Sequence, residues 1–329
     1  MKILFHDNYL CERGTAKALY DYADYNEKIL NNESIITYNA SNTCNVFSIV
    51  DKFSKRFKVI PYYENNKKHV NIDKIVSSEN IDLFYAIKSG EHDEIFTTQC
   101  KNLMHCVFTL KYKHGDVYAS ICEYMSSKHG NIFPFVHHII EDKSNISDNY
   151  RNELGIPNDA IVLGRHGGHD TFSIPFVKEE IINVLNFRKD LWFVFLNTNH
   201  FITHERVIYL PMTIDESLKC KFINTCDAMI HARLDGEVFS LSVAEFSIKN
   251  KPIITWNPDT VPSTYDTGHI FSLKDKGIYY KDRNDIKNIF LHINKSDIVH
   301  KNWDAYSQTF SAKNVMNEFK NVFIERKYQ

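Results

Sequence analysis

The sequence predicts an α/β protein of two domains, each built around a mainly parallel sheet. Short apolar runs alternate along the chain with segments whose apolar residues recur every three or four positions. This alternation is typical of consecutive β-α-β units. The length of 329 residues suits two domains of ordinary size. A polar stretch at residues 141–150 (EDKSNISDNY) places the expected boundary there, between a domain at 1–150 and a domain at 151–304.

The first half carries the pattern of one α/β domain. After the first apolar run, a turn at residues 12–15 is followed by Ala16, Leu19, Tyr20 and Ala23 at helical spacing. The apolar runs of this half, which we expect to form strands, are residues 2–5, 34–38, 58–60, 81–87, 103–108 and 117–121.

A second set of strands and helices begins near residue 158. Thr213 and Glu216 form a Thr-x-x-Glu capping box, which predicts a helix start ahead of Leu218, Phe222 and Ile223. The expected strands are residues 160–163, 191–196, 207–210, 228–232 and 252–256, and further helices are expected at 176–187 and 241–248.

The end of the chain predicts one more amphipathic helix. Within residues 311–323, Val315, Phe319, Val322 and Phe323 lie on one face. An amphipathic helix needs an apolar partner surface, and we expect residues 305–329 to pack back on the first domain.

Composition excludes several classes of protein. Lys and Arg number 39 and Asp and Glu 41, a net charge of −2, which is unlike the basic balance of a nucleic-acid binder. No apolar run is long enough for a signal peptide or a membrane span, which leaves peripheral membrane contact open. The seven cysteines form no Cys-x-x-Cys pair, a pattern that favours reduced thiols and a cytoplasmic location.

The chemistry is concentrated in DGEVFSLSVAEF, residues 235–246, between a strand and a helix. Unpaired backbone N–H groups at the start of this helix, from Phe239 to Ser242, favour a phosphate group. Glu245 then falls in the first turns of the helix, where a carboxylate can accept both hydroxyls of a ribose. Glu237, in the loop before the helix, can reach a sugar beyond the phosphates.

These residues carry a family resemblance. AMIHARLDGEVFSLSVAEF resembles the "hPSxxEGFGLxxLEA" segment of retaining GT-B glycosyltransferases of the GT4-like family, with its Glu-x7-Glu spacing kept by Glu237 and Glu245. GIPNDAIVLGRHGG resembles the start of the family's C-terminal domain, and NLMHCVF resembles a strand ending in a cleft histidine. The resemblance covers most of the chain and is more specific in the second half.

The resemblance implies GT-B architecture, two Rossmann-like domains facing across a cleft, and transfer of a sugar from a nucleoside diphosphate sugar to an acceptor hydroxyl with retention. The acceptor would be a glycan, a lipid or a small molecule. The implied catalytic residues are Glu237 at the donor sugar, Arg165 at the diphosphate and His105 in the cleft. The implied donor-binding residues are Glu245 at the ribose, with Val238, Phe239, Ser240, Leu241, Arg233, Gly14 and Thr15 near the sugar and phosphates.

The sequence also departs from the family pattern. Val238 and Ser240 stand where the family has glycine, and HGGHDTFSIPFV lacks the family's lysine. The compensating charge would come from Arg233, from His169 or from no residue. These departures leave open a non-catalytic protein that binds a nucleotide sugar. Another GT-B enzyme, an epimerase or a phosphorylase, is a second alternative. A nicotinamide-dependent oxidoreductase is disfavoured because HDNYLCERGTAKAL lacks GxGxxG.

No cofactor and no metal are expected beyond the donor substrate. Metal-dependent sugar transferases of the other major fold hold their ion with an Asp-x-Asp pair, and no such pair occurs in the sequence. His166, His169 and Asp170 in the HGGHD loop form only a weak metal motif. We interpret them as part of a polar loop.

Overall fold

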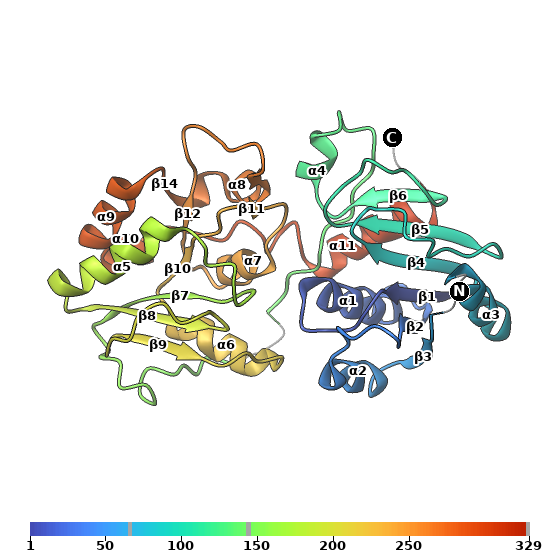
Figure 1. Ribbon diagram of the computed structural model, residues 1–329, viewed down its shortest axis with the longest axis horizontal. Helices are drawn as coiled ribbons and strands as arrows, with labels where there is room; N and C mark the ends of the chain where they lie inside the picture. Colours follow the sequence, from blue (N-terminus) through green and yellow to red (C-terminus); the bar gives the residue numbers. More distant parts are fainter. Residues whose placement is uncertain (65–67, 143–145, 327–329) are drawn as a thin grey trace. The chain divides into compact units, whose positions relative to one another are not determined.

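The computed structural model describes residues 1–64, 68–142 and 146–326, and it divides the chain into two units (Figure 1). Unit 1 comprises Met1–Ile139 together with Thr309–Gln329, and unit 2 comprises Ile140–Gln308. Each unit contains a parallel six-stranded sheet with helices, which confirms the predicted fold class. None of the helices formed by the described residues combines the length and apolar content that crossing a bilayer requires.

The sheet of unit 1 has the order β3-β2-β1-β4-β5-β6, and every neighbouring pair is parallel. Each apolar run expected to form a strand does so, with small shifts at the ends. The strands are β1 (Lys2–Asp7), β2 (Glu33–Asn39), β3 (Lys58–Tyr62), β4 (Leu83–Lys88), β5 (Lys101–Cys106) and β6 (Val117–Ser120). The helices are α1 (Gly14–Lys28), α2 (Phe47–Ser54), α3 (Lys68–Glu79), α4 (Glu123–Ser127), α11 (Ala312–Phe319) and the π-helical turn η2 (Lys320–Ile324).

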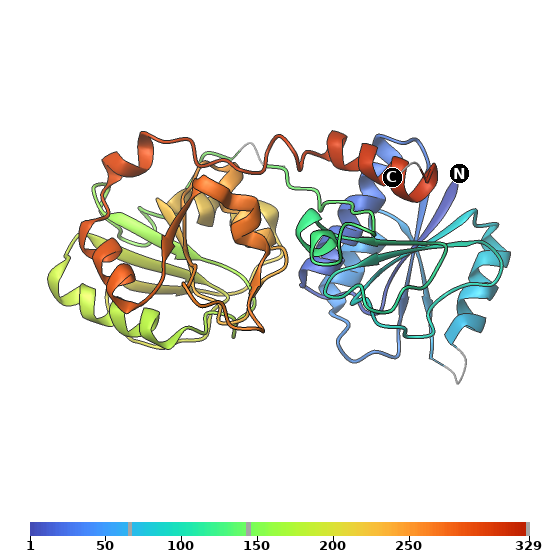
Figure 2. The ribbon, with the colours of Figure 1, turned by 90° about the horizontal axis from the view of Figure 1, so that it is seen from above.

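The end of the chain completes the core of unit 1. Helices α11 and α1 contact each other over the sheet (Figure 2). The ring of Phe319 lies against Phe5 of β1, Tyr22 of α1 and Tyr85 of β4. Burial of one such side chain contributes about 1.5–3 kcal/mol. The apolar face predicted for this helix is therefore the face that the unit 1 core buries.

Unit 2 repeats the layered plan with the order β14-β12-β10-β7-β8-β9, again fully parallel. Helices α5 and α9 contact each other on one face, where Phe290 lies against Phe193. The other face carries α6, whose Phe222 lies against Gly164. The strands are β7 (Ile161–Arg165), β8 (Leu191–Leu196), β9 (Val207–Leu210), β10 (Ala228–His231), β12 (Ile253–Trp256) and β14 (Gly277–Tyr280).

A two-stranded parallel sheet, β11 with β13, lies beside the main one. The remaining elements of unit 2 are β11 (Gly236–Glu237), β13 (Asp266–Thr267), α5 (Pro175–Phe187), α6 (Glu216–Thr225), α7 (Leu241–Ile248), α8 (Gly268–Leu273), η1 (Lys274–Lys276), α9 (Arg283–His292) and α10 (Lys295–Val299).

The segment around the predicted domain boundary belongs to unit 2. Asn224 Nδ2 donates hydrogen bonds to the carbonyls of Ile146 (2.8 Å) and Asp148 (3.0 Å), and the N–H of Tyr150 donates to Thr225 Oγ1 (2.8 Å). These bonds attach the segment to the end of α6. The division therefore falls before residue 140, upstream of the boundary expected at residue 150.

The predicted capping box at the start of α6 is wrong. The N-cap is Asp215, whose carboxylate accepts from the N–H groups of Ser217 (2.7 Å) and Leu218 (3.3 Å). Thr213 Oγ1 instead accepts from the N–H of Asp215 (3.1 Å). A carboxylate at this position satisfies two helical donors and interacts favourably with the helix dipole, which explains why it replaces threonine as the cap.

Asp215→Ala should therefore lower the free energy of unfolding by about 1 kcal/mol. Thr213→Ala, the matched control, should change it by only a few tenths of a kcal/mol, since Thr213 does not cap the helix. Chemical denaturation of both variants measures the difference. A larger loss for Thr213→Ala than for Asp215→Ala would restore the threonine cap.

Candidate functional site

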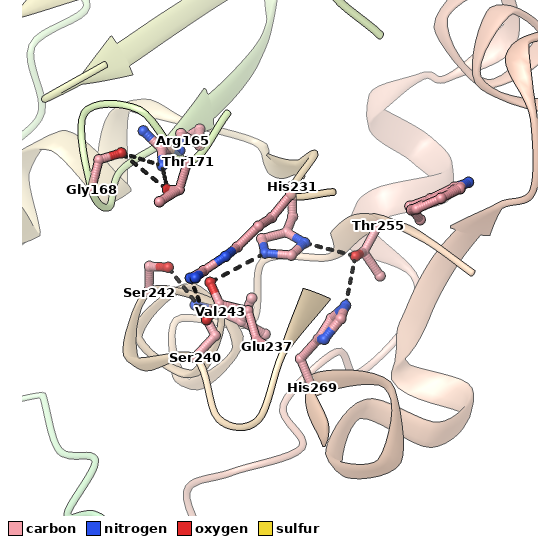
Figure 3. A network of polar contacts seen from close by, with 12 residues as sticks. Arg165, Gly168, Thr171, His231, Glu237, Ser240, Ser242, Val243, Thr255 and His269 are labelled. Atoms are coloured by element: carbon pink, nitrogen blue, oxygen red, sulfur yellow. Dashed lines mark hydrogen bonds and ion pairs between the residues drawn. The ribbon is translucent and has the colours of Figure 1, made fainter. Parts of the chain in front are cut away.

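A polar cavity lies at the carboxyl ends of β7 and β10 in unit 2, the edge of a parallel sheet at which ligands usually bind (Figure 3). It measures about 50 Å³ and is reached by the start of α7. We call it the Arg165 cavity. Its lining residues are Arg165, His166, Gly167, Gly168, Thr171, His231, Ala232, Arg233, Glu237 and Ser242.

Arg165, the last residue of β7, is a buried cation with only 4% of its surface exposed. Its Nη1 donates to Thr198 Oγ1 (2.6 Å) and to the carbonyl of Asn197 (3.3 Å). Its Nη2 donates to the carbonyl of Gly168 (2.8 Å) and to Thr171 Oγ1. All four acceptors are neutral, and no described carboxylate lies within ion-pair distance. Burial lowers the pKa of Arg165 to about 10.

The loop after Arg165 has the shape that its glycines permit. Gly167 has φ of +149°, and a Cβ added there would lie 2.9 Å from Arg165 Nη2. A side chain at this position would therefore crowd the guanidinium. The glycines of HGG let the loop fold closely around Arg165, and the charge of the guanidinium remains beside the cavity.

Glu237 is held at the cavity by an ion pair and by a glycine that precedes it. Arg233 Nη1 lies 2.9 Å from Glu237 Oε2. Gly236 has φ of +64°, and a Cβ there would lie 2.1 Å from the carbonyl oxygen of Asp266 on β13. The glycine at this turn is thus required for the pairing of β11 with β13. In this chain the loop glycine comes before the glutamate, whereas the family pattern has it after.

Besides His166 Nε2, which lies 3.2 Å from Glu245 Oε2, two nitrogens at this cavity are buried without a hydrogen-bond partner among the described residues, His231 Nε2 and Arg233 Nε. A buried polar nitrogen usually has a partner, because leaving it without one costs about 1–3 kcal/mol. Both residues lie beside Glu237, and Arg233 carries a positive charge. The cavity therefore offers hydrogen-bonding groups that an anionic or hydroxylated ligand could satisfy.

The start of α7 lies in the loop that the sequence singled out. Ser240 is the N-cap; its hydroxyl accepts from the N–H of Val243 (3.4 Å) and lies 3.1 Å from Ser242 Oγ. Val238 and Phe239 precede the cap, and Leu241 is the first helical residue. The loop thus brings the N-terminus of α7 and the hydroxyl of Ser242 to the cavity.

Glu245, the second glutamate of the motif, lies beside a different cavity of about 30 Å³. Its Oε1 lies 2.8 Å from Lys219 Nζ, and its Oε2 lies 3.2 Å from His166 Nε2. Burial lowers the pKa of His166, while the carboxylate of Glu245 opposes that shift. His166 also lines the Arg165 cavity, so one imidazole lies at that cavity and contacts Glu245. The residues around the second cavity are Glu141, Asp142, Glu216, Lys219, Cys220, Ile223, Glu245, Ile248 and Lys249.

The structure contradicts the prediction that His105 lines a cleft. His105 lies on β5 in unit 1 and is fully buried. Its Nε2 lies within 3.1 Å of the carbonyls of Ser120 and Val136, so Nε2 is the donor and Nδ1 accepts from the hydroxyl of Tyr85 (2.7 Å). Burial lowers its pKa to about 4. The histidine is a neutral, hydrogen-bonded core residue.

Gly14 and Thr15 form the first turn of α1 in unit 1. The hydroxyl of Thr15 bonds the carboxyl of Asp7, the last residue of β1, whose pKa burial raises to about 7. The part proposed for Gly14 and Thr15 at the donor remains a prediction, as do the donor roles of the unit 2 residues.

Among the described residues, no group of three or more His, Cys, Asp and Glu side chains is arranged to hold a metal ion. Within the HGGHD loop, the ring of His166 points to Glu245, whereas His169 and Asp170 are exposed. The expectation that the protein needs no metal stays a prediction.

Several site residues carried no signal in the sequence. His231 lies inside an apolar strand, and Lys219 lies on a helix far along the chain from Glu245. Thr171 and Thr198 contact Arg165 from loops without a recognisable motif. The polar residue within the apolar run AMIHA was the one available hint of His231.

Comparisons with known proteins identify the fold. No family model and no curated protein matches the sequence, but many solved structures match the fold. Anabaena Alr3699/HepE, solved in complex with UDP-glucose, superposes with a TM-score of 0.71 at 15% identity, covering 98% of this chain and 99% of its own. A glycosyltransferase from Rickettsia africae gives a TM-score of 0.68 at 13% identity, covering 97% and 94%.

A Listeria monocytogenes structure assigned as a UDP-N-acetylglucosamine 2-epimerase gives a TM-score of 0.60 at 11% identity, covering 100% of this chain and 98% of its own. The chain therefore has the GT-B fold of two Rossmann-like domains, which these three solved structures share.

Proposed function

We propose that this protein is a glycosyltransferase that moves a sugar from a nucleoside diphosphate sugar to an acceptor hydroxyl, with retention of the anomeric configuration. The observation that carries the proposal is Arg165, a buried guanidinium with no described carboxylate partner at the edge of the unit 2 sheet. A buried cation whose hydrogen-bond acceptors are all neutral is costly, and an anionic ligand offsets that cost. A guanidinium also matches phosphate oxygens with its planar fork.

Other groups of unit 2 suit the remaining parts of such a donor. The reaction must stabilise a departing diphosphate, and fixed donors and cations do this without reorganisation. Arg165, Arg233 and the N-terminus of α7 supply them in our proposal. Glu237 contacts the donor sugar, and Glu245 binds the ribose.

UDP is the first nucleotide to test, because Anabaena HepE has been solved with UDP and with UDP-glucose. The acceptor is a hydroxyl of a glycan, a lipid or a small molecule. The protein acts in the cytoplasm in this proposal.

An epimerase is the second candidate, favoured by the Listeria structure with the same fold. Epimerisation uses the same diphosphate and ribose contacts but needs no acceptor. A protein that binds the nucleotide sugar without turnover is the third candidate, favoured by the absence of the family's lysine from residues 166–177.

The experiment that tests the proposal has two stages. Calorimetry with UDP and UDP-glucose first measures binding, which should also raise the melting temperature of the native protein. Release of UDP from UDP-glucose is then measured with and without a panel of acceptors, and NMR monitors the sugar. Acceptor-dependent release supports a transferase, and a changed sugar configuration without release supports an epimerase. Absence of binding to any nucleoside diphosphate or its sugar would overturn the proposal.

Sugar transfer should continue at an unchanged initial rate in excess EDTA. The physical reason is that Arg165, Arg233 and the start of α7 can neutralise the leaving diphosphate without an ion. Initial rates in EDTA, and then with added Mg²⁺ or Mn²⁺, measure this. Activity that disappears in EDTA and returns with metal would show that the protein's own charges are insufficient.

A further inference from the structure

Two hydrogen bonds in unit 2 join His269, Thr255 and His231, and His231 lies beside Glu237 (Figure 3). His269 of α8 lies with Nε2 3.1 Å from Thr255 Oγ1, and Thr255 of β12 lies with Oγ1 2.8 Å from His231 Nδ1. On its other side, His231 Nε2 lies 3.7 Å from Glu237 Oε1. His231, Thr255 and His269 are all buried, so these contacts fix the orientation of the His231 ring.

The number of hydrogens on Thr255 and the two histidines limits which of these groups can be donors. The hydroxyl of Thr255 has one hydrogen but faces two ring nitrogens, so it donates to one and accepts from the other. If it donates to His231 Nδ1, a neutral His231 carries its hydrogen on Nε2, toward Glu237. If the hydroxyl donates to His269, it accepts from His231 Nδ1. A neutral His231 then directs the lone pair of Nε2 at the carboxylate, whereas a protonated His231 directs an N–H there.

Each arrangement that suits an ionised Glu237 therefore places an N–H on His231 Nε2. The ion pair with Arg233, at 2.9 Å, occupies Oε2, which leaves Oε1 facing His231. At 3.7 Å the two atoms are too far apart for a direct hydrogen bond. His231 Nε2 is buried with no partner among the described residues, although it lines the Arg165 cavity.

We propose that His231 Nε2 and Glu237 Oε1 together hold one hydroxyl group of the sugar part of the donor. The hydroxyl accepts a hydrogen bond from His231 and donates one to Glu237, which satisfies both atoms. A hydroxyl is suited to this position because it is a donor and an acceptor at once. The inference deepens the proposed function: His231 becomes a residue that selects sugars bearing a hydroxyl at this position.

The test compares UDP with UDP-glucose by calorimetry on the full chain. His231→Phe removes the donor and should weaken UDP-glucose binding up to about tenfold, the loss expected when one buried hydrogen bond is removed. UDP affinity should stay within about twofold, because UDP lacks the sugar. His231→Gln, whose amide can place an N–H near the same point, should retain most of the affinity. Melting temperatures of both variants check that the protein folds.

A series of UDP-deoxyglucose analogues provides a second measurement. A purely structural role of His231 would not change the relative affinities of these analogues. The wild-type protein should discriminate against one analogue by about tenfold or more, because its site is built to bind the missing hydroxyl. His231→Phe should lose that discrimination, as in a double-mutant cycle. Thr255→Val keeps the shape of the side chain but removes the hydrogen bond that orients the His231 ring. This variant should lose part of the discrimination.

The outcomes separate this inference from the proposed function. Equal losses for UDP and UDP-glucose, unchanged affinity for both, or identical discrimination by wild type and His231→Phe would each overturn the role of His231. A wild-type protein that binds neither UDP nor UDP-glucose, nor any other nucleoside diphosphate sugar, would overturn the proposed function and this inference with it.

Discussion

Replacing Arg165 with methionine should lower kcat/KM for sugar transfer by roughly 100- to 1000-fold, the range found when one fixed donor to a developing negative charge is removed. Methionine keeps most of the length of the side chain but has no charge and no forked donors. UDP affinity should fall, whereas uridine affinity should stay the same because uridine has no phosphates. Initial rates and calorimetry with both ligands measure these effects.

Arg206→Met is the matched control for this prediction. Arg206 is also a buried arginine of unit 2, but it donates to the backbone carbonyls of Leu185, Arg188 and Leu191, away from the Arg165 cavity. Its replacement should cost stability without a selective loss of UDP binding. If Arg165→Met weakens uridine and UDP equally, Arg165 serves the fold rather than the diphosphate.

Glu245→Ala should raise the dissociation constants of both UDP and uridine by roughly 10- to 100-fold. Hydrogen bonds to a charged group contribute about 1.5–3 kcal/mol, and the ribose would lose its carboxylate acceptor. The contacts with Lys219 and His166 do not prevent this role, since a carboxylate has about four lone-pair directions. Calorimetry with UDP and 2′-deoxy-UDP measures the effect, and the variant should no longer distinguish the two.

Glu216→Ala provides the control for Glu245. Glu216 lines the same cavity and lies 3.0 Å from the same lysine, Lys219. Its loss should leave nucleotide affinity within about twofold. If Glu245→Ala changes the melting temperature but not nucleotide affinity, Glu245 is a structural partner of Lys219 and His166, and the assignment to the ribose is wrong.

These two predictions start from residues that the sequence could identify. Arg165 ends a strand, and Glu245 lies in the first turns of a helix. At such positions the local geometry follows from the neighbouring residues of the chain. The apolar run 191–196 forms β8 with the bounds expected, and residues 241–248 form α7. Local sequence succeeded here because burial of an apolar run and the start of a helix depend on neighbouring residues.

Sequence reasoning failed where distant segments decide the environment of a side chain. His105 has the sequence position of a cleft histidine, yet β6 and residue 136 supply the carbonyls that enclose it in the core. At α6, both Thr213 and Asp215 are residues that commonly cap helices, and the backbone geometry selected Asp215.

The sequence by itself determined the α/β class, the alternation of strands and helices in both halves, and the spacing that places Glu237 and Glu245 on either side of a helix start. Only the tertiary structure decided that Arg165 has no described carboxylate partner and that His231 faces Glu237. The physical reason is that a hydrogen-bond partner is set by distance in space. Thr255 and His269 reach His231 from β12 and α8, and no local pattern in the sequence records that approach.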